Sequence, residues 1–223
     1  MKLFADTANL QEIEEALQRG FISGITTNPS ILAKEPKGDY RAHIRKIINL
    51  CEKYKVCIPL SVEVFTADPL KMVVQAEEFI HHFGDYQGLN VKVPIGWDEL
   101  GVIHELRQRG IRVNCTCCMA FNQAVMAASA GANYVSIFYG RIRDTGADAF
   151  QVVQRVRQVF KESGVQAEII VGSIRHLYDV NDALLAGADI ITIPSKFFKP
   201  MTQHPKTDEA VQQFLTDFNT WVN

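Results

Sequence analysis

The stretch Leu89-Asn90-Val91-Lys92-Val93-Pro94 is short and mainly apolar, which is the pattern of a buried β-strand. An amphipathic helix is predicted directly after it, at Trp97–Arg109, and a second strand at Arg112–Thr116. Gly110 lies between that helix and that strand, where a left-handed helix cap is expected. Strands that alternate with helices in this way favour a parallel sheet.

The same alternation extends along the whole chain. Strands are predicted at Lys2–Asp6, Gly24–Thr27, Leu60–Val64, Asn90–Pro94, Arg112–Thr116, Tyr134–Phe138, Ala167–Gly172 and Ile190–Ile193. Helices are predicted at Leu10–Arg19, Tyr40–Tyr54, Pro69–Phe83, Trp97–Arg109, Phe121–Ala130, Ala149–Ser163 and Leu177–Ala186. The count of strands and the chain length predict an α/β protein of the closed (β/α)8 TIM barrel type. The alternative is an open, doubly wound sheet, but Asp6-Thr7-Ala8-Asn9 is not the glycine-rich turn that binds dinucleotides in such sheets.

The C-terminal segment Thr207–Val222 predicts one further amphipathic helix after the last strand. Its apolar side carries Ala210, Val211, Phe214, Phe218 and Trp221. Such a face has to be buried, either across the end of the barrel or against a neighbouring subunit. We therefore expect a catalytic barrel over residues 1–206 and a C-terminal helix over residues 207–223 that packs on a neighbouring subunit.

The composition is close to that of an ordinary soluble globular protein, with 47% hydrophobic and 22% charged residues. A net charge of -2 provides no basic face for nucleic acid and no polybasic membrane anchor, so neither partner is expected. No apolar stretch approaches the roughly 20 residues of a membrane span, and the N-terminus lacks a signal-peptide pattern. The expected compartment is the cytoplasm.

The cysteines form an odd set of five, and three of them fall within Cys115-Thr116-Cys117-Cys118. This cluster suggests a metal site, but no second pair of cysteines or histidines lies nearby at ligand spacing. On a strand, Cys115 and Cys117 are expected on one face and Thr116 and Cys118 on the other. We expect them to be small buried hydrophobic residues, with a redox or metal role as the alternative.

Lys92 is the residue that least fits its surroundings. A lysine on the interior of a sheet is costly unless its charge is paired or lost. Desolvation favours the neutral amine, and a neutral amine can attack a carbonyl to form a Schiff base. Lys92 is therefore the candidate nucleophile, and a structural lysine paired with Asp6 or Glu63 is the alternative.

Other polar residues fall at the ends of predicted strands, where the reactive groups of a (β/α) barrel gather. Asp6 and Glu63 are candidates for proton transfer, and Asn114 and Thr116 end the fifth strand. The turn Thr26-Thr27-Asn28-Pro29-Ser30 offers hydroxyl and amide groups, Thr27 and Asn28 among them, that suit a polyol, although it can simply start a helix.

Two arginines and a serine follow the sixth and seventh strands, at Arg141, Ser173 and Arg175. Planar guanidinium groups suit bidentate contact with a phosphate or a sulfonate. Many barrels bind phosphate beside these late loops. The three residues therefore predict an anion site.

Short motifs recur in a fixed order along the chain: Phe4-Ala5-Asp6-Thr7-Ala8, Gly24-Ile25-Thr26-Thr27-Asn28-Pro29-Ser30, Val91-Lys92-Val93-Pro94, Asn114-Cys115-Thr116, Phe138-Tyr139-Gly140-Arg141, Ser173-Ile174-Arg175 and Met201-Thr202-Gln203-His204-Pro205. In this order they are similar to the motifs of the small-subunit transaldolase and fructose-6-phosphate aldolase family. Each motif is weak alone, but the series is highly specific. The resemblance covers almost the whole chain.

The resemblance implies a Schiff-base enzyme with no metal and no organic cofactor. Lys92 would bind the C2 carbonyl of a ketose, and Asp6 would take and return the proton of the hydroxyl whose carbon bond breaks. Glu63, with Thr116 and an ordered water, would move protons during carbinolamine formation. The remaining roles would be contacts of Asn28 and Asn114 with the hydroxyls of the dihydroxyacetone unit, and of Arg141, Ser173 and Arg175 with the distal phosphate.

Within this family, members that look like transaldolases carry Glu and Phe at the positions of Glu63 and Phe138, and direct aldolases carry Gln and Tyr. A phenol there would help to release the three-carbon intermediate, whereas a phenyl ring leaves it for an acceptor. Tyr139 is adjacent to Phe138 but is expected to point the other way. The resemblance thus implies a transaldolase of the pentose phosphate pathway.

The expected reaction moves a dihydroxyacetone unit from fructose 6-phosphate or sedoheptulose 7-phosphate to erythrose 4-phosphate or glyceraldehyde 3-phosphate. The alternatives are an aldolase that releases free dihydroxyacetone, a transaldolase for a sulfonated sugar, a non-catalytic sugar-phosphate-binding protein and a barrel with a structural lysine. The residues Cys117-Cys118-Met119-Ala120 depart from the family pattern and leave the acceptor open. The resemblance also implies a homo-oligomer, either a ring of five or a decamer.

Overall fold

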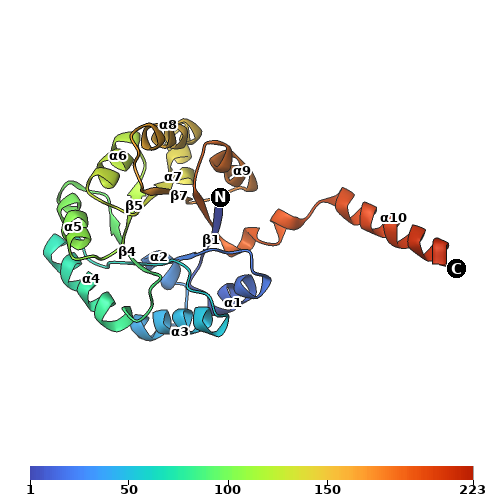
Figure 1. Cartoon of the computed structure of the whole chain (residues 1–223), viewed down its shortest axis with the longest axis horizontal. Helices are drawn as coiled ribbons and strands as arrows, with labels where there is room; N and C mark the ends of the chain where they lie inside the picture. The colour runs from blue at the N-terminus through green and yellow to red at the C-terminus, as the bar shows by residue number, and fades with distance from the viewer. Residues whose placement is uncertain (223) are drawn as a thin grey trace.

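The computed structural model describes residues 1–222, and they form a closed barrel of eight parallel strands in chain order (Figure 1). The strands are β1 Lys2–Asp6, β2 Ile25–Thr26, β3 Leu60–Glu63, β4 Leu89–Pro94, β5 Val113–Cys118, β6 Tyr134–Phe138, β7 Glu168–Gly172 and β8 Ile190–Ile193. The ring closes because β1 pairs with β8 as well as with β2. The predicted (β/α)8 barrel is confirmed, and the open sheet is excluded.

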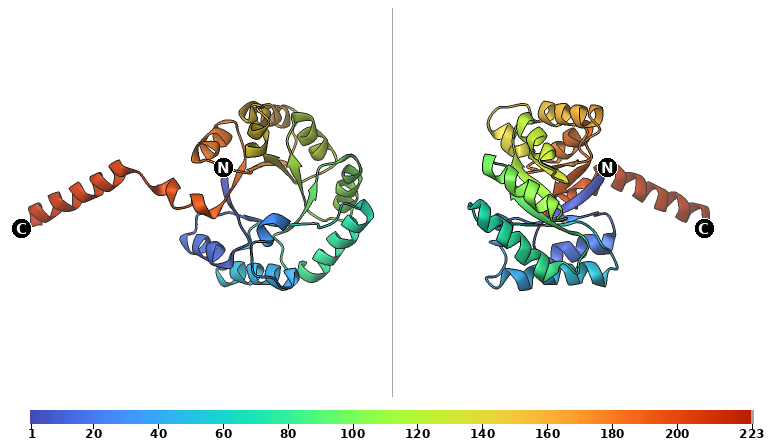
Figure 2. Two further views of the ribbon diagram at one scale, coloured as in Figure 1. Left: turned by 180° about the vertical axis from the view of Figure 1, so that it is seen from behind. Right: turned by 60° about the vertical axis from the view of Figure 1, so that its left-hand side comes forward.

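Helices surround the barrel, as Figure 2 shows. The longer ones are α1 Leu10–Arg19, α3 Tyr40–Lys53, α4 Pro69–Phe83, α5 Trp97–Gln108, α6 Phe121–Ser129, α8 Ala149–Glu162 and α9 Leu177–Leu185. Helical periodicity predicted each of these to within one residue at either end. It missed the short helices, which are α2 Pro29–Leu32, α7 Tyr139–Asp144, η1 Ser195–Phe197 and η2 Pro200–Thr202. Helices of three to six residues are too short to show a period.

The outward faces of the strands and the inward faces of the helices share one apolar core. Ile25, Val62, Val91 and Val113 are fully buried in it. Because side chains alternate along a strand, the neighbours of these residues point into the barrel. Apolar contacts between the barrel and its helices therefore provide most of the core. The side chains inside the barrel are a separate set.

The interior changes character along the strands. Four inward residues near the amino ends pack together as a small apolar cluster: Phe4, Tyr134, Ile170 and Ile190. The next inward residues on the same four strands line a cavity: Asp6, Ser136, Gly172 and Thr192. Gly24 makes room for this arrangement, since a Cβ atom there would overlap the ring of Phe4. The barrel interior is thus filled by apolar side chains at the amino ends of the strands and lined by polar side chains at their carboxyl ends.

The last helix, α10 Pro205–Val222, extends away from the barrel (Figure 1). Every residue from Met201 to Val222 is exposed, including Phe214 at 69% and Trp221 at 81%. Its start precedes the predicted one by two residues, and Asn223, the end of the predicted segment, lies outside the described residues. Packing across the end of the barrel, one of the two expectations for this helix, is not observed. No helix within residues 1–222 is long and apolar enough to cross a membrane.

Candidate active site

A cavity of about 340 Å³ opens at the carboxyl ends of the strands. It brings together most of the side chains that the sequence singled out: Asp6, Asn28, Glu63, Lys92, Thr116, Phe138, Arg141 and Ser173. Three of the predicted site residues, Thr27, Asn114 and Arg175, do not line it. The strand ends of a closed barrel converge on one rim, which explains why residues far apart in sequence meet here.

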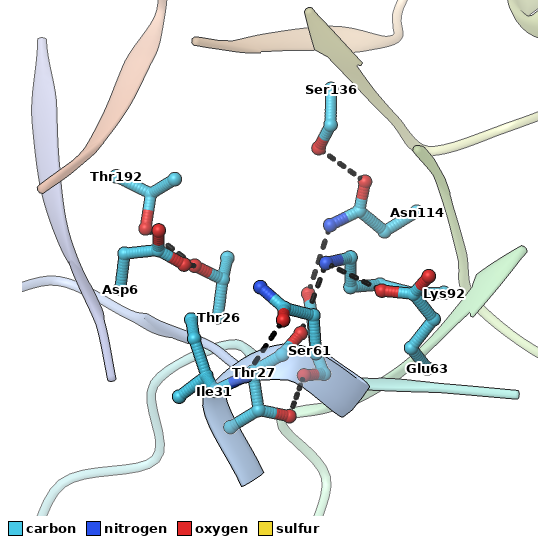
Figure 3. Close-up of polar contacts among 11 residues, drawn as sticks. Asp6, Thr26, Thr27, Ile31, Ser61, Glu63, Lys92, Asn114, Ser136 and Thr192 are labelled. Atoms are coloured by element: carbon cyan, nitrogen blue, oxygen red, sulfur yellow. Dashed lines mark hydrogen bonds and ion pairs between the residues drawn. The ribbon is translucent and has the colours of Figure 1, made fainter. Parts of the chain in front are cut away.

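Lys92 lies on β4 with its side chain only 4% exposed, beside Glu63 on β3 (Figure 3). Its Nζ is 3.0 Å from Glu63 Oε2 and donates a hydrogen bond of 2.9 Å to the carbonyl oxygen of Thr27. Register explains the pair, because Glu63 and Lys92 are direct partners across the two strands. The buried amine therefore has a carboxylate within proton-transfer distance.

Thr27 contributes to the site through its backbone. Its carbonyl oxygen accepts the hydrogen bond from Lys92, while its own hydroxyl donates to the carbonyl oxygen of Ser61 at 2.9 Å. The side chain is fully buried and does not reach the cavity. Thr27 thus positions the amine, whereas the sequence predicted contact with substrate hydroxyls.

Asp6 lies across the cavity from Lys92 and is held by Thr26, which in turn contacts Thr192 (Figure 3). Thr26 Oγ1 donates to Asp6 Oδ1 at 2.8 Å and lies 2.5 Å from Thr192 Oγ1. With its proton directed at Asp6, Thr26 accepts the hydrogen bond from Thr192. Burial raises the pKa of Asp6, and the charge of Lys92 and the hydrogen bond from Thr26 offset part of that rise.

The hydroxyl of Thr26 is expected to set the acid limit of activity. Replacing Thr26 with valine removes a hydrogen bond that lowers the pKa of Asp6, so the pKa rises further. The acid limb of kcat/KM against pH should therefore move to higher pH in Thr26→Val. Thr26→Ser retains the hydroxyl and should keep the wild-type limb. Superimposable profiles for the valine and serine variants would contradict this assignment.

Asn114 lies just behind the cavity wall and is fixed by two serines (Figure 3). Its Nδ2 donates to Ser61 Oγ at 3.1 Å, and its Oδ1 accepts from Ser136 Oγ at 2.7 Å. These contacts fix the orientation of the amide. Ser61, Ser136 and Thr192 were not predicted as site residues, although each is a polar residue on an inward position of an otherwise apolar strand.

The end of β5 does not follow strict alternation. Thr116 and Cys117 both line the cavity, whereas Cys115 and Cys118 are both buried in the apolar core. Cys117 has a left-handed backbone with φ of 63°, and the pairing of β5 with β6 shifts register between Cys115 and Cys118. The prediction that Cys115 and Cys117 share one face of the strand, and Thr116 and Cys118 the other, is therefore wrong. One residue with a left-handed backbone interrupts the alternation of side chains.

Thr116 Oγ1 is the polar atom of the site that most needs a partner. It is buried and forms no hydrogen bond within residues 1–222. A buried hydroxyl without a partner costs stability, and native proteins contain few of them. Because Thr116 lines the cavity that holds Lys92 and Glu63, this hydroxyl is available to a bound molecule.

The rim of the cavity carries Arg141, Ser173 and Phe138. The guanidinium carbon of Arg141 lies 5.7 Å from the centroid of the Phe138 ring, and Arg141 forms no ion pair within residues 1–222. Ser173 has a left-handed backbone with φ of 59°, a conformation that costs on the order of 1–3 kcal/mol and occurs preferentially at functional sites. Tyr139 starts α7 and is buried in the core, so it points away from the cavity as expected.

Asn28 lines the cavity from the start of α2. Its Oδ1 accepts a hydrogen bond of 3.0 Å from the backbone N–H of Ile31 and so caps that helix. The amide NH₂ group is not used by this cap. The turn therefore starts a helix, one of the two expectations for it, and contact of Asn28 with a polyol stays a prediction.

A buried amine beside one carboxylate, a second carboxylate opposite and an arginine at the rim define a (β/α)8-barrel enzyme site suited to carbonyl chemistry on a small anionic substrate. The profile of the family described as transaldolase/fructose-6-phosphate aldolase matches residues 3–223. This chain belongs to that family and is an enzyme of the transaldolase type.

Several relatives named probable transaldolase resemble the chain over nearly its full length. The protein from Syntrophomonas wolfei is 39% identical, covering 98% of each chain. That from Dehalococcoides mccartyi is 37% identical, covering 99% of each, and that from Thermoplasma volcanium is 38% identical, covering 98% of this chain and 95% of its own. A thiamine phosphate pyrophosphorylase from Pyrococcus furiosus superimposes with a TM-score of 0.62 at 14% identity, over 87% of this chain and 85% of its own. That likeness shows the fold alone.

Proposed function

We propose that the protein is a Schiff-base transaldolase that moves a dihydroxyacetone unit between sugar phosphates. The donor would be fructose 6-phosphate or sedoheptulose 7-phosphate, and the acceptor erythrose 4-phosphate or glyceraldehyde 3-phosphate, as in the pentose phosphate pathway. The observation that carries the proposal is the buried Lys92 amine, 3.0 Å from Glu63 inside the cavity. In such a pair the amine can pass a proton to the carboxylate and take it back without exchange with bulk water.

In the first half of the reaction, Glu63 accepts a proton from Lys92 and the neutral amine attacks the C2 carbonyl of the donor. Loss of water then gives an iminium ion, with Glu63 and the Thr116 hydroxyl next to the departing oxygen. The Asp6 carboxylate takes the proton of the C4 hydroxyl as the C3–C4 bond breaks. The bond electrons pass to the iminium, which becomes an enamine, and the aldose phosphate leaves.

In the second half, C3 of the enamine attacks the aldehyde of the acceptor, and Asp6 returns the proton to the new hydroxyl. Hydrolysis of the iminium then releases the product and the free amine. Phe138 supports transfer over simple cleavage, because its phenyl ring lines the cavity without a hydroxyl that could help water to reach the enamine. This feature favours the transaldolase over an aldolase that releases dihydroxyacetone.

Anion recognition is proposed for Arg141 and Ser173 at the rim. Arg141 is the arginine that lines the cavity, and it forms no ion pair within residues 1–222. The backbone N–H and hydroxyl of Ser173 are additional donors for the oxygens of a phosphate. A sulfonate has the same geometry with one negative charge, so a sulfonated sugar is a competing substrate.

Borohydride trapping tests the proposed function. Incubation with fructose 6-phosphate and borohydride should add a reduced three-carbon unit to Lys92, measured by intact mass and peptide mapping. Free dihydroxyacetone without an acceptor would show the aldolase reaction instead, and a faster reaction with a sulfonated ketose would reassign the substrate. Absence of an adduct with every ketose tested would contradict the Schiff-base mechanism.

We further propose that α10 packs on a neighbouring copy in a homo-oligomer of five or ten chains. Its exposed side chains Val211, Phe214, Phe218 and Trp221 lie on one face, and isolated helices of this kind seldom persist in water. Deleting residues 207–223 should therefore lower the mass measured by light scattering to that of a smaller species. Phe218→Glu should do the same, whereas Gln212→Glu, on the opposite face, should not. An unchanged mass for both the deletion and Phe218→Glu would contradict the proposal.

A further inference from the structure

Arg175 is directed away from the catalytic cavity. Its Nη2 forms an ion pair of 2.6 Å with Asp144 Oδ2, and each side chain is about half exposed, at 48% and 54%. The stem of Arg175 crosses Gly140, where an added Cβ atom would lie 2.6 Å from Arg175 Cγ. Gly140 thus leaves a path for the arginine side chain between the loop after β7 and the end of α7.

The backbone at Arg175 is held much more firmly than its side chain. The buried carboxylate of Asp179 accepts hydrogen bonds from the N–H groups of Arg175 at 2.8 Å and His176 at 2.9 Å, and it also pairs with Arg143. Within residues 1–222, the guanidinium of Arg175 has only the exposed pair with Asp144, and exposed pairs of this kind contribute little to stability. The guanidinium can therefore change partner while its backbone stays in place.

Arg175 starts from the rim of the catalytic cavity. Ser173, which lines that cavity, is two residues away, and its carbonyl oxygen accepts a hydrogen bond of 3.1 Å from the N–H of Gly140. Arg141, next to Gly140, is the arginine already at the cavity. An anion that binds to Arg141 and Ser173 would thus lie near the base of the Arg175 side chain and would compete with Asp144 for its guanidinium.

We propose that Asp144 is a specificity-determining residue that sets the affinity of the site for the phosphate of its substrate. Asp144 holds Arg175 outside the cavity, and only an anion with enough charge to replace the carboxylate draws the guanidinium inward. A phosphate dianion meets this condition better than a sulfonate monoanion or an uncharged sugar. The proposed function supplies the identity of the sugar on which this inference rests. The role of Asp144 concerns the anion site itself and does not depend on which sugar carries the phosphate.

The neighbouring residues support an exchange of partners over a second, permanent anion site. Arg143, Asp144, Arg175 and Asp179 line a separate cavity of about 220 Å³ with Gly140 and His176. There each arginine is paired with one aspartate, so the two charges of each sign cancel. No surplus positive charge remains in this cavity to hold an anion, and Arg175 becomes available only when Asp144 releases it.

The test compares Asp144→Asn with wild type for substrates with and without phosphate. Loss of the competing carboxylate should lower KM for fructose 6-phosphate by about three- to fivefold, with little change in kcat. The dissociation constant of inorganic phosphate, measured by calorimetry, should fall by a similar factor. Trapping of unphosphorylated dihydroxyacetone on Lys92 should be unchanged. In a protein that already carries Arg175→Ala, the Asp144→Asn change should have no effect on phosphate binding.

Asp85→Asn is the matched control, because Asp85 forms a comparable exposed pair with Arg45 far from the site, and its kinetics should match wild type. Unchanged or weaker phosphate binding by Asp144→Asn would overturn the inference, as would an equal gain for unphosphorylated dihydroxyacetone. The phosphate titration does not depend on turnover. A wild-type protein that binds phosphate but forms no adduct with fructose 6-phosphate would therefore contradict the proposed function. Phosphate binding by Asp144→Asn and by wild type would still test the role of Asp144.

Discussion

Replacing Lys92 with methionine should abolish the borohydride-trapped adduct and lower kcat/KM by at least about 10⁴-fold, the order of loss seen when an enzyme loses its covalent nucleophile. Methionine fills a similar volume but cannot attack a carbonyl. Lys92 is the one lysine among the described residues that line the cavity, and the Cys117 thiol that also lines it has no nitrogen with which to form an iminium. The measurement is intact mass after trapping, together with coupled turnover of the donor and acceptor.

Folding has to be controlled separately, because Lys92→Met leaves Glu63 without its partner. Removal of one member of a buried pair typically destabilises a protein by about 3–5 kcal/mol, and Glu63 is itself only 14% exposed. The double variant Lys92→Met/Glu63→Gln removes that charge, so it should regain stability and remain inactive. An adduct at another lysine, or activity in the stable double variant, would show that Lys92 is structural.

Asp6→Asn should change activity and stability in opposite directions. Activity should fall by about 10²–10⁴-fold, since the amide cannot accept the proton of the hydroxyl when the carbon bond breaks. Stability should rise at neutral pH, because burial raises the pKa of Asp6 and a charged carboxylate is therefore held at a cost in the folded state. The result would be a more stable and nearly inactive protein.

The sign of the pH dependence follows from proton linkage. A folded-state pKa above the ordinary value means that the folded protein binds the Asp6 proton more tightly than the unfolded chain does. The penalty is fully present above the raised pKa, and it disappears as the pH falls below the ordinary pKa of an aspartate. The excess melting temperature of Asp6→Asn over wild type should thus be largest near neutral pH and shrink as the pH falls towards the ordinary pKa of an aspartate.

The exposed Asp208→Asn provides the matched control for charge, and it should change neither activity nor melting temperature. A melting temperature of Asp6→Asn below wild type at neutral pH would mean that the attraction between Asp6 and Lys92 outweighs desolvation. Full activity would remove Asp6 from the mechanism.

Much of the site was predictable because it is built from strand ends. Lys92 and Glu63 are inward residues on adjacent strands, and parallel pairing in chain order makes them direct partners. The same logic places Asp6 on the rim. Periodicity also predicted the helices that cover the barrel, since a helix with one apolar stripe has only one way to bury it.

Contacts between distant strands were not predictable in the same way. Thr26 meets Thr192 only because the barrel closes between β1 and β8, and the sequence separation of 166 residues gives no local signal of it. The hydrogen bond of Asn114 on β5 with Ser61 on β3 likewise passes over a strand between them, whereas its bond with Ser136 joins the adjacent strand β6. These residues act by orienting others, so their chemistry alone did not single them out.

By itself, the sequence determined the order of strands and helices, the alternation that separates core from cavity, and the side chains that can carry carbonyl chemistry. These follow from local periodicity and from residue type, which are properties of the chain. The tertiary structure decided which face Cys117 presents, because a left-handed backbone is not encoded by alternation. It also decided that Thr27 acts through its carbonyl and that Arg175 pairs with Asp144. Each depends on which groups from other elements come within reach, and only the closed barrel sets those distances.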